Sequence, residues 1–199
     1  MEKLEEIIKQ IKEDAKESLV PIVRDKTLCH IKKLIEQTKP AHILEIGTAV
    51  GYSGLEMLHS GAKKLTTIEK NEDRFISALK NFERAGVSNA VRALNGDAID
   101  MLKLLEEEGE RFEFVFLDGP KGQYIKYLPI IKKLLTGGGI LFADNVGVLG
   151  LVAHSELVTH KNRTMVRNMQ AFLNEVQNDG SFDTEIFDID DGYAICRKK

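Results

Sequence analysis

Three side chains with oxygen donors come directly after two predicted strands. Asp118 follows the strand expected at Glu113–Leu117. Asp144 and Asn145 follow the strand expected at Gly139–Ala143. Because the carboxyl ends of parallel strands lie at one edge of a sheet, where ligands bind, these side chains can converge. Two carboxylates and an amide oxygen suit a hard cation such as Mg²⁺. A single aspartate after a strand is commonly a helix cap or a turn residue, but the Asp-Asn pair favours the metal site.

Lys121 lies three residues beyond Asp118, in a loop stiffened by Pro120. Most lysines are solvated surface residues, and this is the plain alternative here. Beside a divalent cation the ammonium form is disfavoured, and a neutral amine could remove a hydroxyl proton near pH 7. Lys121 is therefore a candidate general base.

The turn after the first predicted strand carries a glycine pattern that favours a bound nucleoside. Gly47 and Gly51 are four residues apart, and Ala49 stands where the G-x-G-x-x-G pattern of dinucleotide-binding proteins has its second glycine. A wider loop of this kind does not need to hold a pyrophosphate. Ser53 and Glu56 have the spacing of a capping box, which predicts that a helix begins directly after the loop.

Polar side chains at the ends of the next two strands support the same interpretation. Glu69 lies 22 residues beyond Gly47, where an acidic side chain in this topology accepts hydrogen bonds from ribose hydroxyls. Asp97 lies between Gly96 and Ala98 after the third strand, where a short polar side chain could read an adenine edge. A glycine turn alone fits any α/β connection, but its combination with Glu69 and Asp97 favours a nucleoside cofactor.

A sheet must bring these strand ends together, and the chain after Pro40 repeats a unit of strand, turn and amphipathic helix. The strands are expected at His42–Ile46, Lys64–Ile68, Val91–Leu94, Glu113–Leu117 and Gly139–Ala143, and the helices at Ser53–His59, Glu72–Ala85, Ala98–Glu107 and Tyr124–Leu135. Parallel strands joined by right-handed helical crossovers predict a doubly wound α/β domain.

Further elements are expected on both sides of this repeat. Amphipathic helices are expected at Met1–Leu19 and Asp25–Thr38 before the repeat, and a helix from Arg163 to about Val176 after it. Two apolar runs near the end of the chain, 182–187 and 193–197, flank Asp190-Asp191-Gly192, and Asp-Gly between such runs predicts a hairpin. An antiparallel pair next to a parallel sheet departs from the dehydrogenase pattern and favours the methyltransferase variant of this architecture.

Length and composition predict a single domain. The chain has 199 residues, 43% of them hydrophobic and 30% charged, with residues 1–38 expected as N-terminal helices and 39–199 as the sheet core. We expect no membrane segment, no signal peptide and a cytoplasmic location. Cys29 and Cys196 lack disulfide or metal spacing, so both are expected to be buried thiols. The net charge of −3 means that nucleic acid could be attracted only by a local basic patch.

These motifs together resemble the cation-dependent class I O-methyltransferases, the family of the catechol and caffeoyl-CoA O-methyltransferases. The resemblance is carried, in chain order, by residues 43–53, 67–69, 96–98, 117–124 and 143–146. The chain is most similar to a bacterial branch that includes the tRNA 5-hydroxyuridine methyltransferases, on the basis of Val20-Pro21-Ile22 and the stretch Arg163–Arg167.

The resemblance implies a cofactor, a metal ion and a role for each site residue. S-adenosylmethionine would be held by Val23, Glu45, Gly47, Ser53, Glu69, Asp97, Ala98 and Asp118. Mg²⁺, or another hard divalent cation, would be held by Asp118, Asp144 and Asn145. Lys121 and Asp118 would be the catalytic residues, with Lys121 as the base. Methyl transfer is an in-line displacement, so the protein must align the acceptor oxygen and supply it partly deprotonated.

The acceptor is expected to be a hydroxyl beside a second oxygen, because such a pair can chelate one cation. There is no Trp in the chain, and Val146–Gly150 offers no large aromatic side chain to pack on a catechol ring. Lys161, Arg163 and Arg167 form a basic cluster after the fifth strand, although such residues on a helix are usually only solvated. The first expectation is the 5-hydroxyl of a uridine in tRNA, and the alternative is a small catechol-like or phenolic acceptor.

Two other classes of protein share some of these features. An NAD-binding oxidoreductase is disfavoured by Ala49 and by the C-terminal hairpin. A non-catalytic nucleoside-binding module is disfavoured because Lys121 and the three metal ligands are all present.

The N-terminal amphipathic helix is expected to pack on a second subunit, which predicts a homodimer.

Overall fold

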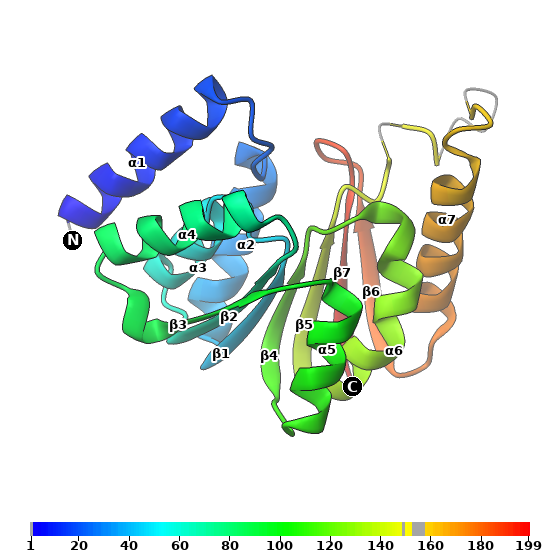
Figure 1. Cartoon of the computed structure of the whole chain (residues 1–199). Coiled ribbons are helices and arrows are strands. Elements are labelled where there is room, and N and C mark those ends of the chain that lie inside the picture. The colour runs from blue at the N-terminus through cyan, green and yellow to red at the C-terminus, as the bar shows by residue number, and fades with distance from the viewer. Residues whose placement is uncertain (1, 149, 153–157) are drawn as a thin grey trace. The chain divides into compact units, whose positions relative to one another are not determined.

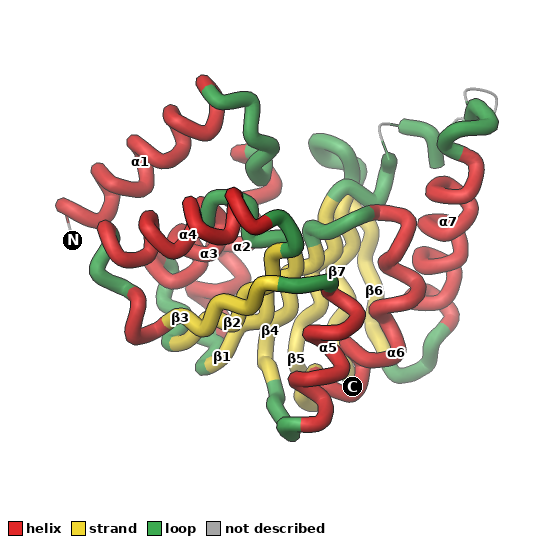
Figure 2. Tube along the Cα trace, viewed as in Figure 1, coloured by secondary structure: helices red, strands yellow, loops and turns green. Residues whose placement is uncertain are grey.

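The structure is a computed structural model that describes residues 2–148, 150–152 and 158–199. Strands and helices alternate between residues 42 and 144 (Figures 1 and 2). In chain order they are α1 (Glu2–Glu17), α2 (Asp25–Thr38), β1 (His42–Ile46), α3 (Tyr52–His59), β2 (Lys64–Glu69), α4 (Glu72–Arg84), η1 (Ser88–Ala90), β3 (Val91–Asn95), α5 (Ala98–Glu107), β4 (Phe112–Leu117), η2 (Lys121–Gln123), α6 (Tyr124–Leu134), β5 (Leu135–Asp144), α7 (Arg163–Asn178), β6 (Phe182–Phe187) and β7 (Tyr193–Lys198). Every helix and strand expected from the sequence is present, so the predicted α/β fold is confirmed.

The contacts divide the chain into two compact units, Met1–Met101 and Leu102–Lys199. The boundary lies inside α5. α1 and α2 both pack against α3, so they belong to the unit that contains the first strands. That the whole chain forms a single domain stays a prediction.

The first unit contains three parallel strands in the order β3-β2-β1. Ile43 pairs with Leu65, and Leu65 pairs with Val91 on the next strand. Four of the five β1 residues are buried, because a parallel strand is covered on both faces and therefore carries a nearly continuous apolar run.

The second unit contains four strands in the order β4-β5-β7-β6. β4 and β5 are parallel, while β7 is antiparallel to both β5 and β6, which confirms the predicted C-terminal hairpin. Phe142 of β5 stacks on Tyr193 of β7 with ring centroids 4.8 Å apart. β5 begins at Leu135, earlier than predicted, because Leu135 pairs with Phe112 ahead of a register shift in the ladder.

Cys29 corrects one sequence expectation, because it is exposed rather than buried. The buried stripe of α2 consists of Thr27, Leu28, Ile31 and Ile35, and Cys29 lies on the opposite side of the helix. Cys196 is buried as expected, and burial raises the pKa of its thiol to about 11. Within the described residues, no helix combines the length and the apolar character needed to cross a membrane.

Candidate cofactor loop and metal site

The loop between β1 and α3 holds an unusual backbone conformation in the first unit. Gly47, Ala49 and Gly51 all have positive φ angles, of 107°, 47° and 84°. At Gly51 a Cβ atom would lie 2.9 Å from the ring of Phe82, so both the space and the angle require glycine. The predicted tight turn off the first strand is therefore present. Ala49 carries a side chain in the left-handed region, which costs about 1–2 kcal/mol and must be offset by contacts elsewhere.

Glu69 supplies one of these contacts. One oxygen of its carboxylate accepts a hydrogen bond of 2.8 Å from the backbone amide of Ala49. The other oxygen accepts one of 2.8 Å from the backbone amide of Asn71. The residue is 8% exposed, so part of its surface can still reach a ligand. Each carboxylate oxygen can accept a second hydrogen bond, and these positions suit the hydroxyls of a ribose. Contact with a cofactor stays a prediction for Glu69.

Asp97 lies at the start of α5, directly before Ala98. Its carboxylate accepts hydrogen bonds from Lys70 Nζ at 2.9 Å and from the Ile99 amide at 3.1 Å. The hydrogen bond from Lys70, followed by the one from Ile99, lowers the pKa of Asp97. Its side chain is 39% exposed and remains open to a ligand. Val23 is buried in the connection that leads into α2.

Ser53 does not cap α3, contrary to the sequence prediction. The residue before the helix is Gly51, which provides no side-chain cap, and Ser53 lies inside the first turn. The Ser53 hydroxyl instead donates a hydrogen bond of 2.5 Å to Glu45. Glu56, the expected partner in the capping box, accepts a hydrogen bond from Lys32 at 2.7 Å. A carboxylate is a stronger acceptor than a neutral group, and Glu45 lies close enough to accept the hydrogen bond from the Ser53 hydroxyl.

Glu45 is fully buried, and hydroxyl groups of the protein occupy both of its carboxylate oxygens. A direct contact between this carboxylate and a cofactor would require the network to open. Its predicted role as a cofactor ligand is untested, and its observed contacts lie within the protein. The second donor, Thr67, was missed by sequence reasoning, although a polar residue in a buried strand indicates a hydrogen bond within the protein.

The residues predicted to do the chemistry lie in the second unit. Lys121 Nζ donates a hydrogen bond of 2.6 Å to Asp118 and one of 3.1 Å to the Tyr124 hydroxyl. The side chains of Lys121 and Asp118 are 21% and 24% exposed, so both can meet a ligand. The structure therefore brings together the two residues predicted to be catalytic.

Tyr124 was missed as a site residue by sequence reasoning, which placed it at the start of a helix and at the end of the motif 117–124 but gave it no role. It is fully buried, and its hydroxyl lies 2.9 Å from the Leu117 carbonyl and 3.0 Å from the Asp144 carbonyl. Burial, and then the charges of Asp118 and Asp144, raise the pKa of Tyr124 well above its usual range. One protonated phenol thus ties the end of β4 to the end of β5.

Asp144 is the last residue of β5, and Asn145 begins the turn that follows. Asp144 is 2% exposed, and its carboxylate accepts a hydrogen bond of 2.7 Å from the backbone amide of Asn145. Burial raises the pKa of Asp144 to about 7, the charge of Asp118 adds to this rise, and Lys121 opposes it. The hairpin holds the turn in place, because the Val146 amide donates to the Gly192 carbonyl at 2.9 Å.

The donor set of Asp118, Asp144 and Asn145 fits a hard cation. Two carboxylates that repel each other, together with an amide side chain, offer oxygen ligands to Mg²⁺. Among the described residues, no group of three or more His, Cys, Asp and Glu side chains could hold a metal ion. The predicted site therefore depends on the amide of Asn145 and on water or substrate oxygens for its remaining ligands. No sulfur or imidazole group belongs to the predicted set, which disfavours zinc.

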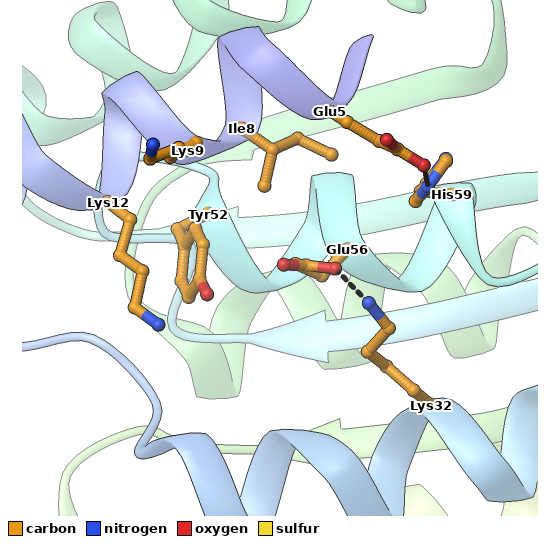
Figure 3. Close-up of a pocket in the computed structure, with 8 residues that line it drawn as sticks. All are labelled: Glu5, Ile8, Lys9, Lys12, Lys32, Tyr52, Glu56 and His59. Carbon is orange, nitrogen blue, oxygen red and sulfur yellow. Dashed lines mark hydrogen bonds and ion pairs between the residues drawn. The ribbon is translucent and has the colours of Figure 1, made fainter. Parts of the chain in front are cut away.

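A separate pocket of about 290 Å³ lies in the first unit between α1, α2 and α3 (Figure 3). It is lined by Glu5, Ile8, Lys9, Lys12, Lys32, Tyr52, Glu56 and His59. An ion pair joins Lys32 to Glu56 at 2.7 Å, and a hydrogen bond joins His59 and Glu5 at 3.2 Å. Its charges are largely compensated within the protein, and none of the predicted site residues lines it.

The basic cluster predicted after the fifth strand is exposed. Lys161, Arg163 and Arg167 all lie at the surface, the latter two on α7. The same helix contacts η2, the turn that carries Lys121, because the Asn168 amide donates a hydrogen bond of 2.8 Å to the Gly122 carbonyl. α7 thus connects exposed cations to the loop of the predicted base.

Comparison with known proteins identifies the family. The family model described as O-methyltransferase matches residues 1–199. A catechol O-methyltransferase from Niastella koreensis is 35% identical over 119 residues, which cover 58% of this chain and 54% of that enzyme. The tapetum-specific methyltransferase 1 of Arabidopsis thaliana is 25% identical over 206 residues, covering 97% of this chain and 86% of that protein.

Solved structures agree with this result. A candidate caffeoyl-CoA O-methyltransferase from Staphylococcus aureus has a TM-score of 0.88 and 32% identity, covering 96% of this chain and 92% of that one. An O-methyltransferase from Bacillus cereus, solved with SAH, has a TM-score of 0.87 and 23% identity, covering 98% and 91%, which shows the shared fold. The chain belongs to the O-methyltransferase family, and this membership sets aside the oxidoreductase alternative.

Proposed function

We propose that the protein transfers a methyl group from S-adenosylmethionine to a hydroxyl oxygen, with the help of a hard divalent cation. The observation that carries the proposal is the cluster of Asp118, Lys121 and Asp144, in which a lysine amine contacts one of two neighbouring carboxylates. The positive-φ loop and the acidic side chains of Glu69 and Asp97 support the cofactor part of the proposal. SAM and SAH are bound by O-methyltransferases of the same fold from Streptomyces achromogenes and Bacillus cereus.

The proposed reaction is a single displacement. A lone pair of the acceptor oxygen forms the new bond to the methyl carbon, while the carbon–sulfur bond breaks and its electrons stay on sulfur. Lys121 Nζ takes the proton of the acceptor hydroxyl. The resulting ammonium donates to Asp118 and to the Tyr124 hydroxyl, which already lie 2.6 and 3.1 Å from it. Tyr124 keeps its own proton, because its pKa is raised by burial.

Asp118, Asp144 and Asn145 would hold the cation. A bound Mg²⁺ would lower the pKa of the acceptor hydroxyl and orient it together with a neighbouring oxygen. The fit rests on the two carboxylates, whose mutual repulsion a cation would relieve, and on the Asn145 amide. Asn145 has a φ of 55°, which turns its backbone sharply after the strand.

The cofactor and the metal can be tested separately. Isothermal titration of the purified protein with SAH should give binding in the presence of EDTA. Methyl transfer should require Mg²⁺ and stop when EDTA is added. Asp144→Asn should abolish turnover while SAH binding persists. Asp183→Asn, which removes an exposed carboxylate from β6, is the matched control and should leave both unchanged. Full activity of Asp144→Asn in EDTA would contradict the metal assignment.

For the acceptor, we propose the 5-hydroxyl of a uridine in tRNA, whose 4-oxo group supplies the second oxygen of a chelate. The proposal is supported by the exposed Arg163 and Arg167 on α7 and by the contact of that helix with the Lys121 loop. The second candidate is a small catechol, because the relative from Niastella koreensis is a catechol O-methyltransferase. A homodimer and a cytoplasmic location are further proposals that rest on the sequence.

Nucleoside mass spectrometry distinguishes the two acceptors. The enzyme is incubated with labelled S-adenosylmethionine in two separate reactions. One contains tRNA that carries 5-hydroxyuridine, and the other contains catechol. We expect 5-methoxyuridine, and we expect Arg163→Ala combined with Arg167→Ala to weaken RNA binding and reduce its salt dependence, since phosphate contacts release counterions. Label in methylated catechol alone would favour the small acceptor.

A further inference from the structure

A row of buried hydroxyl groups lies beneath the loop Gly47–Gly51, the candidate cofactor loop. The Thr48 and Thr67 hydroxyls are 2.5 Å apart, and Thr67 donates to Glu45 at 2.6 Å. Ser53 donates to the other oxygen of the same carboxylate at 2.5 Å. Thr67 and Glu45 are fully buried, and Thr48 is 1% exposed. The row joins the loop to the strand beneath it and to the first turn of α3.

The direction of each hydrogen bond in this row is fixed. A threonine hydroxyl has one proton, and Thr67 uses it to donate a hydrogen bond to Glu45. The Thr67 oxygen can therefore only accept from Thr48, which makes Thr48 the donor in that pair. Glu45 is the final acceptor for the whole row, and Thr67 links Thr48 to Glu45.

The loop needs support of this kind because its backbone is strained. Ala49, the residue after Thr48, has a φ of 47° without being glycine. On one side its amide is held by Glu69 at 2.8 Å. On the other side the Thr48 hydroxyl is held by Thr67, and the Thr48 amide donates to the Ile68 carbonyl at 3.2 Å. Without Thr67 the side-chain anchor of Thr48 is lost while the backbone strain remains.

We propose that Thr67 is a positioning residue for cofactor binding, whose hydroxyl couples Thr48 in the loop to the buried carboxylate of Glu45. The inference rests on the proposed function, since it takes the Gly47–Gly51 loop to be the S-adenosylmethionine site. Thr67 needs no contact with the cofactor. It acts by holding the loop in the one conformation that presents the backbone to a ligand, so that binding does not have to supply the ordering free energy.

The test uses two adjacent threonines of β2. Thr67→Val has nearly the same shape and removes only the hydroxyl function. Thr66→Val is the matched control, because Thr66 is equally buried but its hydroxyl bonds to His42 at 2.9 Å instead of to the loop. Thr67→Ser restores the hydroxyl. The measurements are the dissociation constant for SAH by titration calorimetry and the melting temperature of each variant.

We expect Thr67→Val to weaken SAH binding about tenfold, the size expected for one hydrogen bond in a buried network. Thr67→Ser should recover most of the affinity, and Thr66→Val should bind SAH as the parent protein does. Thr48→Val breaks the same link from the loop side and should reproduce the loss. The double variant Thr48→Val, Thr67→Val should be little worse than either single variant, because both remove the same link.

The possible outcomes separate the two proposals. If the parent protein fails to bind SAH, the proposed function falls and this inference falls with it. If the parent binds SAH and Thr67→Val binds it equally well, only the positioning role is overturned. Equal losses of affinity in Thr66→Val and Thr67→Val, in proportion to their melting temperatures, would also overturn it, because they would indicate a general loss of stability. If Thr67→Val does not fold, Thr48→Val and Thr67→Ser decide the question.

Discussion

Tyr124→Phe should destabilise the protein at the centre of the candidate metal site. The substitution keeps the ring, including its edge contact with Phe172 at a centroid distance of 5.5 Å, so apolar packing is unchanged. It removes the hydroxyl that lies 2.9 Å from the Leu117 carbonyl and 3.0 Å from the Asp144 carbonyl. It also removes an acceptor for Lys121. The effect is therefore one of hydrogen bonding alone.

The magnitude follows from the number of groups left without a partner. A single proton serves the two carbonyls, so the variant loses about one strong donor interaction and leaves buried acceptors short of a donor, at a cost of about 1–3 kcal/mol. For a chain of this length each kcal/mol corresponds to roughly 2–4 °C in melting temperature. The phenol also sets the position of Lys121 Nζ, so turnover should fall while SAH affinity stays unchanged.

Urea denaturation followed by circular dichroism measures the free energy of unfolding, and Tyr127→Phe gives the cost of deleting another buried phenol from the same helix. Turnover is measured with whichever acceptor the parent enzyme methylates. If Tyr124→Phe is as stable as the parent protein, the hydroxyl does not tie the two strand ends together, and the reasoning is refuted. Loss of stability with unchanged turnover would refute only the part that concerns Lys121.

Three further substitutions test contacts described above. Asp179 contacts Lys132, and hydrogen bonds from Lys132 and then from Ser181 lower its pKa to about 2. Its stabilising contribution is thus complete above the unfolded pKa of about 4 and disappears as the pH falls toward 2. Asp179→Asn should lower the free energy of unfolding by about 1–2 kcal/mol at pH 7. It should also make the free energy of unfolding depend less on pH between about pH 4 and 2, as measured by acid titration with circular dichroism. Glu69→Ala should weaken SAH binding by about 1–3 kcal/mol, and an unchanged dissociation constant in calorimetry would reduce Glu69 to a charge at a strand end. Gly51→Ala should lower the melting temperature and SAH affinity together, since its Cβ would meet the ring of Phe82; a variant of parental stability would show that the loop adapts.

The sequence predicted the elements well wherever their ends carry strong signals. Asp25–Thr38 and His42–Ile46 agree with the structure at both ends, because Pro40 cannot continue the helix and the next residues are apolar and β-branched. Phe182–Phe187 agrees in the same way, since Asp-Gly marks the hairpin that follows. Lys121 and Asp118 could be paired in advance, because three residues in a short turn keep two side chains close.

The sequence failed where a residue had two possible partners. Ser53 has the spacing of a cap, but the choice between a backbone amide and Glu45 depends on how closely the end of β1 approaches α3. Tyr124 reads as a core aromatic, and only the structure shows that its hydroxyl meets two strand ends. Periodicity records which side of an element is buried, but it does not record which polar atoms meet there.

The contact between α7 and the turn that carries Lys121 has a consequence for how the acceptor specificity of such an enzyme can change. Met165 and Asn168 are turned toward Gly122, whereas Arg163 and Arg167 are exposed. The two pairs lie on different sides of one helix, so mutation can change the exposed pair while the inner pair keeps its place. Selection could thus redirect such an enzyme to an acidic, neutral or apolar acceptor through a few surface exchanges. Lys121, the proposed base, would be inherited unchanged.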